Sequence, residues 1–167
     1  MRWLFSLIVT LLAFVLLAGT AYADDYYVDP VAGDDGNTGL SPGDPWRTVT
    51  HALWTVPTGS VVHLAPGLYH RDNGEDWPLP ITDVEIVGAG SGETVLWGGW
   101  FQAHGGSPFY GLKMSGVTLR RGKIGIRVFR YHAYSTALEL HDVHILEMEG
   151  DGINVDGFGD DFDDTYC

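Results

Sequence analysis

The chain is poor in cysteine and in basic residues. One cysteine, Cys167, stands among 167 residues. An internal disulfide is therefore excluded, and we expect hydrogen bonding and packing to stabilise the fold. Nine lysines and arginines stand against 22 aspartates and glutamates, which gives a formal net charge of −13 at pH 7. A chain of this charge repels nucleic acid and anionic membranes, so we expect no nucleic-acid partner.

Several catalytic motifs are also missing. The sequence has no phosphate-binding loop, no CxxC pair and no Ser-His-Asp nucleophile motif. What is present suits one packed domain, because 45% of the residues are hydrophobic and only 19% are charged. Glycine is abundant at 23 residues, without a collagen-like period.

The first 23 residues have the pattern of a signal peptide. Arg2 precedes an apolar run over residues 4–17, and Ala21-Tyr22-Ala23 is a small-x-small cleavage pattern. We therefore expect a secreted or extracytoplasmic protein, in the periplasm or at the cell surface, with no stable membrane span after signal cleavage. An uncleaved anchor is the alternative, because the apolar run approaches the length that spans a membrane.

Helical periodicity is nearly absent from the rest of the chain. One short helix is expected over residues 46–54, where Val49 and Leu53 fall on one face. Elsewhere short apolar runs alternate with polar residues and are interrupted by glycine, which predicts strands. The expected strands are residues 61–64, 84–87, 94–97, 112–114, 117–119, 124–128, 138–140, 143–145 and 153–155.

Two segments repeat. Residues 112–119 align with 138–145 at an offset of 26, and residues 125–128 align with 152–155 at an offset of 27. Residues 84–87 are a weaker copy of the segment that begins at Val117, at an offset of 33. A period of this length is typical of a solenoid, and three short strands per period favour an all-β, right-handed parallel β-helix. Val117 would then stack on Val143, and Leu119 on Ile145, about 4.8 Å apart. Two similar hairpins in a β-sandwich are the alternative.

The opening segments add a family resemblance. Tyr27-Val28-Asp29-Pro30, Pro45-Trp46-Arg47-Thr48 and Pro66-Gly67-Leu68-Tyr69 follow one another between residues 26 and 69. In this order they resemble the start of secreted pectate-lyase-like β-helix proteins, and the domain of unknown function that begins such helices. The resemblance implies that the helix at 46–54 caps the first coil. In the lyases that the chain resembles, a lysine or arginine removes the proton next to a uronate carboxylate, which calcium neutralises.

The resemblance and the repeat together divide the chain. We expect a signal peptide over residues 1–23, a strand, turn-rich segment and capping helix over 24–58, parallel β-helix coils over 59–157, and an acidic tail over 158–167. No second cap is evident. The chain is then either truncated or covered at its last coil by the tail or a partner. Self-association through the open C-terminal coil is one such expectation.

A basic cluster is the sharpest candidate site. Six of the nine lysines and arginines lie between residues 113 and 130. Lys123 and Arg127 are the candidate catalytic residues. The candidate substrate-binding residues are Arg120, Arg121 and Arg130, together with Trp97 and Trp100, whose rings could stack on sugars. The favoured alternative is an outward-facing row that pairs with acidic residues of adjacent coils: Glu139, Asp142 and Glu147.

Acidic residues suggest a calcium site or a pair of catalytic acids. Asp151, Asn154 and Asp156 surround one expected strand and offer the oxygen ligands that calcium prefers, and calcium is the one cofactor indicated. Paired acids for glycoside hydrolysis are a second interpretation, and a solvated turn with a disordered tail is favoured over both. The loop at 33–39 is likewise more typical of a structural turn than of a calcium loop.

The histidines at 141 and 144 make a poor zinc pair. Their spacing of three places them on opposite faces of a strand. We therefore expect surface or coil-lining roles for both rather than metal binding.

These observations lead to one leading hypothesis and two rivals. We expect a secreted β-helix domain of a carbohydrate-active or carbohydrate-binding protein, with a polysaccharide or cell-surface glycan as partner. As an enzyme it would be a calcium-assisted polysaccharide lyase acting on uronate polymers. The first rival is a non-catalytic cell-surface or adhesion module, and the weaker one is a glycoside hydrolase. Whether the protein is an enzyme stays open at this point.

Overall fold

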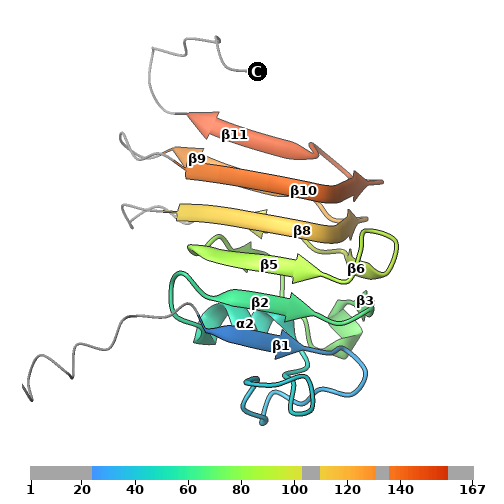
Figure 1. Ribbon diagram of the computed structural model, residues 1–167. Helices are drawn as coiled ribbons and strands as arrows, with labels where there is room; N and C mark the ends of the chain where they lie inside the picture. Colours follow the sequence, from blue (N-terminus) through green and yellow to red (C-terminus); the bar gives the residue numbers. More distant parts are fainter. Residues whose placement is uncertain (1–23, 103–109, 131–135, 158–167) are drawn as a thin grey trace, which may run out of the picture.

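The protein consists mainly of parallel strands stacked one above another (Figure 1). The computed structural model describes residues 24–102, 110–130 and 136–157; the expected signal peptide and acidic tail lie outside these ranges. One sheet stacks β1 (Asp25–Val28), β2 (Val61–Leu64), β5 (Val84–Gly88), β8 (Tyr110–Arg120) and β10 (Thr136–Leu146) in chain order. In the same sheet, β6 (Thr94–Trp97) joins the second half of β8 and β3 (Gly67–Tyr69) follows it.

A second sheet faces part of the first. It contains β4 (Leu79–Pro80), β7 (Phe101–Gln102), β9 (Ile126–Arg130) and β11 (Ile153–Gly157), again in parallel pairs. Parallel neighbours need a crossover connection. Here the chain passes through a strand of the second sheet on its way between neighbours of the first, as β9 does between β8 and β10.

Two residues with left-handed backbone bend the long strands. Gly116 in β8 has φ 64° and Asp142 in β10 has φ 51°. The first half of β8 pairs with β5 and its second half with β6, so one strand follows two directions of the sheet. The bend also shifts the alternation of side chains. Met114 and Val117, three residues apart, are therefore both buried, although a straight strand would point them to opposite faces.

The same bend corrects the prediction for the histidines of β10. His141 and His144 flank Asp142 and Val143, and both are exposed. The expected opposite faces are wrong because the left-handed residue at 142 lies between the two histidines.

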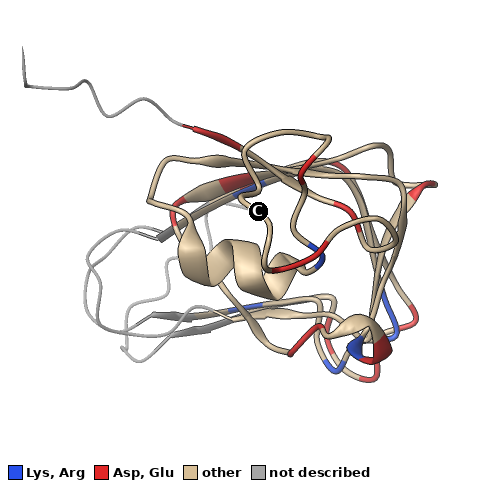
Figure 2. Cartoon of the chain, turned by 90° about the horizontal axis from the view of Figure 1, so that it is seen from below, with Lys and Arg blue, Asp and Glu red and all other residues tan. Residues whose placement is uncertain are grey.

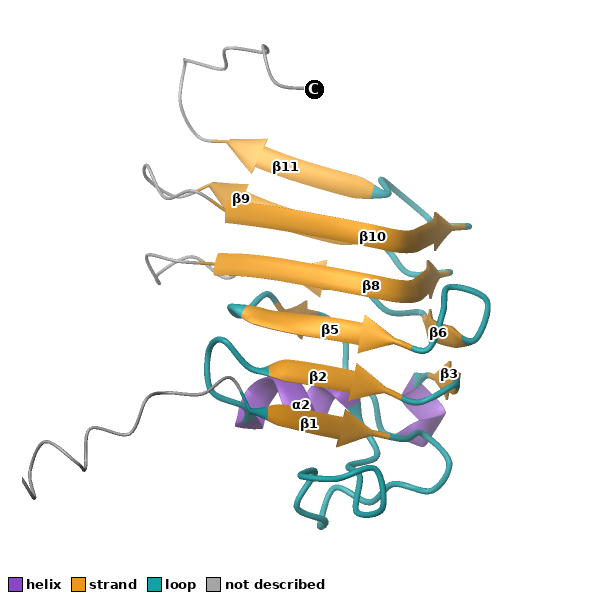
Figure 3. Cartoon of the chain, in the orientation of Figure 1, coloured by secondary structure: helices purple, strands orange, loops and turns teal. Residues whose placement is uncertain are grey.

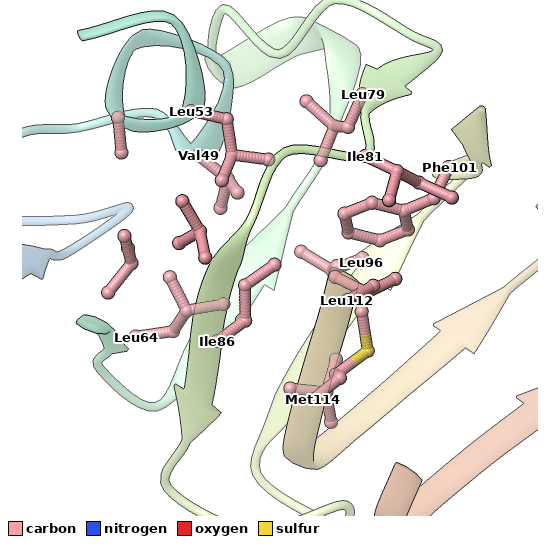
Figure 4. Close-up of a cluster of buried hydrophobic side chains, with 14 of the residues drawn as sticks. Val49, Leu53, Leu64, Leu79, Ile81, Ile86, Leu96, Phe101, Leu112 and Met114 are labelled. Carbon is pink, nitrogen blue, oxygen red and sulfur yellow. The ribbon is translucent and has the colours of Figure 1, made fainter. Parts of the chain in front are cut away.

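Aliphatic side chains form ladders between the sheets (Figure 4). Val117 pairs with Val143 and Leu119 with Ile145, which confirms the predicted stacking. Met114 pairs with Ile86 on one side and with Leu140 on the other, and it is 1% exposed. Burying one such side chain contributes roughly 1.5–3 kcal/mol. The second sheet and the segment after β4 add further buried residues to the same cluster: Leu79, Ile81, Phe101 and Ile126.

One strand alignment from the sequence is wrong. Val84 pairs with Leu112, at an offset of 28, and not with Val117 at an offset of 33. The reason is the bend in β8, because β5 matches only the half before Gly116 and β6 matches the half after it. The sequence pattern also missed the short strands β3, β4 and β7, which have two or three residues each.

The helix α2 (Val49–Thr55) covers the β1 end of the core (Figures 2 and 3). It contacts β1 of the first sheet and β4 of the second, and it buries Val49, Ala52 and Leu53. Thr48 caps it by accepting a hydrogen bond from the His51 amide at 3.0 Å. The expected helix is confirmed, but it starts at Val49 rather than at Trp46.

Trp46 has a different role from the one expected. Its backbone bridges to Val28, and its amide donates to the Tyr27 carbonyl at 2.9 Å. Its ring stacks on Tyr26 with centroids 5.2 Å apart. Because its backbone pairs with the β1 segment, Trp46 is not part of the helix. Its ring packs against that segment instead.

The loop at 33–39 uses its polar groups within the fold. The Asp34 carboxylate accepts from the Gly36 amide at 2.8 Å, and Asp35 accepts from the amides of Arg47 and Thr48 at 2.9 Å each. These bonds agree with the structural turn that the sequence favoured. In the ranges described, no helix has the length and apolar character needed to cross a membrane.

Candidate functional site

A cleft of about 530 Å³ lies at one corner of the stack, where the chain leaves the first sheet for the second. Each of three successive connections contributes to it. The segment after β3 contributes His70, Arg71 and Asp72; the end of β6 contributes Trp97 and the residues after it; and the segment after β8 contributes Lys123. The complete lining is Leu68, His70, Arg71, Asp72, Trp77, Trp97, Gly98, Trp100 and Lys123.

Three tryptophans give the cleft an aromatic lining. Trp77, Trp97 and Trp100 are all half-buried. Trp77 lies so close to the turn at Gly99 that a Cβ there would stand 2.9 Å from the Trp77 ring, so this turn needs glycine. Partly exposed indole rings offer a large flat apolar face, which can stack on the apolar face of a sugar ring.

Charged groups surround the rings. His70 Nδ1 lies 3.5 Å from the Asp72 carboxylate, and the Arg71 guanidinium lies 3.7 Å from Asp76. Lys123 is exposed and forms no ion pair with any residue in the described ranges. The cleft therefore contains cationic groups on a chain whose net charge is strongly negative.

Of the predicted site residues, three line this cleft. Trp97 and Trp100, predicted to bind substrate, come together with Lys123, predicted to be catalytic. Arg127, its predicted catalytic companion, is on β9 between Gln102 and Asn154 and does not line the cleft. The side chain of Arg130 lies outside the described residues.

Arg120 and Arg121 form a separate cluster beside the cleft. Both guanidinium groups bind the carboxylate of Glu147, and Arg121 Nε does so at 2.6 Å. Both also lie over the ring of Trp97, at 5.4 and 4.9 Å from its centroid. The two arginines lower the pKa of Glu147 to about 2. The alternative interpretation, a charge row paired across strands, describes this cluster and the Lys113–Glu139 pair at 3.3 Å.

The acidic residues of the C-terminal strand are brought together only in part. Asn154 Nδ2 donates to the Asp151 carboxylate at 2.7 Å, whereas the side chain of Asp156 lies outside the described residues. Within the described ranges, no three His, Cys, Asp or Glu side chains group as a metal site would require. The third residue of the calcium prediction therefore stays unplaced.

Sequence reasoning missed most of the cleft. Trp77, His70, Arg71 and Asp72 were not predicted as site residues. The repeat spacing does not identify them, because the ladder offset changes at this corner. Tyr69 pairs with Leu96 at an offset of 27, and Trp97 pairs with Arg120 at an offset of 23.

Glu75 is a second residue that the sequence analysis missed, and its role is structural. It is only 2% exposed and accepts hydrogen bonds from the amides of Val49 and Thr50 at 2.7 and 2.9 Å. Burial raises its pKa above the ordinary value, against the opposing effect of these bonds. Through these bonds Glu75 connects the segment between β3 and β4 to the first turn of α2.

Comparison with known proteins gives one match. The sequence model of a protein family described as protein of unknown function (DUF1565) matches residues 31–123. No curated protein and no solved structure matches the chain. The matched range runs from the loop before α2 to Lys123, so it contains every residue that lines the cleft.

Proposed function

Because the chain belongs to the DUF1565 family of proteins of unknown function, we propose its role from the cleft itself: the protein binds a polysaccharide or cell-surface glycan there. The observation that carries this proposal is the meeting of three tryptophans, Trp77, Trp97 and Trp100, in one open cleft. The volume of about 530 Å³ falls within the usual range of ligand sites.

The charges of the cleft favour an acidic glycan. Lys123 is exposed and has no ion pair among the described residues, whereas the exposed Arg71 lies 3.7 Å from Asp76 and Asp72 adds one negative charge to the lining. The positive charge of Lys123 and Arg71 is local, since the chain as a whole carries −13. Guanidinium and ammonium groups form strong charge-assisted hydrogen bonds with carboxylates, so uronate-containing polymers are the preferred substrate class in this proposal.

The wider proposal concerns the architecture and location. We infer that the two sheets are walls of one right-handed parallel β-helix. The ladder offsets support this, because Met114 follows Ile86 by 28 residues and Leu140 follows Met114 by 26. The small-x-small pattern at residues 21–23 supports secretion, which would place the cleft where extracellular glycans are available.

Catalysis by lyase chemistry is a further part of the proposal. Lys123 is the residue of the predicted catalytic pair that lines the cleft, so it is the candidate base for removing the proton next to a uronate carboxylate. In this scheme calcium comes from solution. Asp72, a carboxylate that lines the cleft, would offer it an oxygen ligand.

Binding is tested with variants on a glycan array and by titration calorimetry. Trp100→Ala should weaken glycan binding about tenfold, because loss of one stacked ring removes roughly 1.4 kcal/mol. Trp54→Ala is the matched control, since Trp54 is 70% exposed on α2, away from the cleft. Unchanged affinity in Trp100→Ala, or no retained glycan with the wild type, would contradict the proposal.

Turnover is tested separately, with polygalacturonate, alginate and neutral glycans, each with and without calcium. A rise in the ultraviolet absorbance of unsaturated uronate that Lys123→Gln abolishes supports the lyase scheme. New reducing ends without that absorbance would indicate hydrolysis instead. Retention of glycan without either product would restrict the function to binding.

A further inference from the structure

Three successive strands contribute to the cluster of Trp97, Arg120, Arg121 and Glu147. Trp97 ends β6 and pairs in the ladder with Arg120, which ends β8. Glu147 follows the last residue of β10, next along the stack. Its carboxylate receives both arginines, and both arginines lie over the ring of Trp97.

The backbone explains how two adjacent arginines reach one target. Successive side chains of a strand point to opposite faces. Arg121 has φ 57° and Glu147 has φ 54°, so the left-handed backbone interrupts the alternation at both positions. Arg120 and Arg121 can therefore turn toward the same carboxylate and the same ring.

The order of the strands sets the arginines apart from part of the cleft lining, although Lys123, which follows β8, also lines the cleft. In the sheet, β6 lies between β8 and β3. The arginines approach Trp97 from the β8 side, whereas His70 and Arg71, which line the cleft, follow β3 on the other side. Neither Arg120 nor Arg121 lines the cleft.

The carboxylate of the cluster is already used, whereas one guanidinium nitrogen is not. The Glu147 carboxylate bridges both guanidinium groups. Arg120 Nε is buried and has no hydrogen-bond acceptor among the described residues, and its guanidinium lies over Trp97. A guanidinium stacked on an indole face is attracted by the ring, and this attraction fixes the plane of the ring.

We propose that Arg120, Arg121 and Glu147 are positioning residues that hold the Trp97 ring as a wall of the cleft without touching the ligand. This inference rests on the proposed glycan binding, and it changes the role that the sequence analysis gave to the two arginines. The competing account is that the arginines bind a ligand carboxylate and that Glu147 occupies their site in its absence.

The two accounts predict opposite changes in the affinity for acidic glycans when Glu147 is replaced. Glu147→Gln removes the charge that holds both arginines. Under our proposal the ring loses its fixed orientation, so the variant binds neutral and acidic glycans about threefold to tenfold more weakly. Under the competing account, the variant binds acidic glycans more tightly and neutral glycans unchanged, and that result would overturn the proposal.

A ligand-free measurement keeps the test independent of glycan binding. The indole N–H signal of Trp97 and the near-ultraviolet circular dichroism should report a less ordered ring in Glu147→Gln. Arg121→Lys keeps the charge but loses planar stacking, and should show a smaller change of the same kind. Glu139→Gln is the control. It removes the exposed ion pair between Lys113 of β8 and Glu139 of β10, and it should change neither readout.

The two proposals fail in different ways. An unchanged Trp97 signal in both Glu147→Gln and Arg121→Lys overturns the positioning role, whatever the glycan result. Absence of glycan binding by the wild type, with a disordered Trp97 ring in the variants, overturns the proposed function and leaves the structural role of the cluster supported.

Discussion

At the scale of single residues, a few left-handed positions determine where side chains point. Gly116 and Asp142 let β8 and β10 turn a corner and still bury apolar residues on both sides of it. Hydrogen bonds stabilise the left-handed backbone at Asp142. Its carboxylate accepts from the Ser91 hydroxyl at 2.7 Å and from the Ser91 amide at 3.1 Å. Aspartate tolerates this conformation better than most residues do.

Gly116 has less freedom than Asp142. A Cβ at Gly116 would stand 2.8 Å from the Gly88 carbonyl oxygen, and φ is 64°. Gly116→Ala should therefore lower the free energy of unfolding by about 1–3 kcal/mol. Urea unfolding followed by circular dichroism measures this.

The matched control for that substitution is Gly92→Ala. Nothing lies within 4 Å of a Cβ at Gly92, and its φ is not positive. The control should leave the free energy of unfolding nearly unchanged. Equal effects of the two substitutions would show that the corner at Gly116 does not need glycine.

At the scale of elements, the sequence predicted what alternation and repetition can encode. The pattern Leu112, Met114, Val117 and Leu119 marks buried positions, and all four are buried as expected. Strands of two residues such as β4 and β7 were not predicted, because so short a segment has no measurable period. The start of α2 was placed too early because Trp46 fits the helical face, whereas its backbone is paired with the β1 segment.

The candidate site was predicted in part for a similar reason. Trp97, Trp100 and Lys123 have the residue types that bind sugars and carboxylates, so composition alone indicates them. Trp77 and Arg71 line the cleft only because the stacking of parallel strands brings connections from different parts of the chain together. Glu75 was missed because nothing local distinguishes a buried glutamate from an exposed one.

Glu75 gives the helix cap a dependence on pH. Burial raises its pKa in the folded protein above the ordinary value of the unfolded chain. The folded state therefore holds the proton more tightly. The resulting stabilisation is fully present below the ordinary pKa and is lost as the pH rises through the raised value.

The prediction is a comparison of the wild type with Glu75→Gln, which does not titrate. The difference in their free energies of unfolding, wild type minus variant, should be smaller at neutral pH than at acidic pH. Urea unfolding at several pH values measures the difference. A difference that grows toward neutral pH would contradict the assigned role of burial.

At the scale of the whole molecule, stacking brings distant segments of the chain to one surface. Arg71, Trp97 and Lys123 lie at or after the ends of β3, β6 and β8 and line one cleft. The strands thus act as a rigid frame, and the connections between them carry the chemistry. Because the chain as a whole carries a formal charge of −13, the cations of the cleft are a local exception to its overall charge.

The central claim, that this cleft binds glycan, is tested most directly by titrating the indole N–H signals of the wild type with a uronate oligosaccharide. The account predicts that the signals of Trp77, Trp97 and Trp100 shift together and saturate. The signals of Trp46, which is 3% exposed beneath β1, and of Trp54 on α2 should stay in place. Shifts at Trp54 with none at the three cleft tryptophans, or no shift at any glycan concentration, would contradict it.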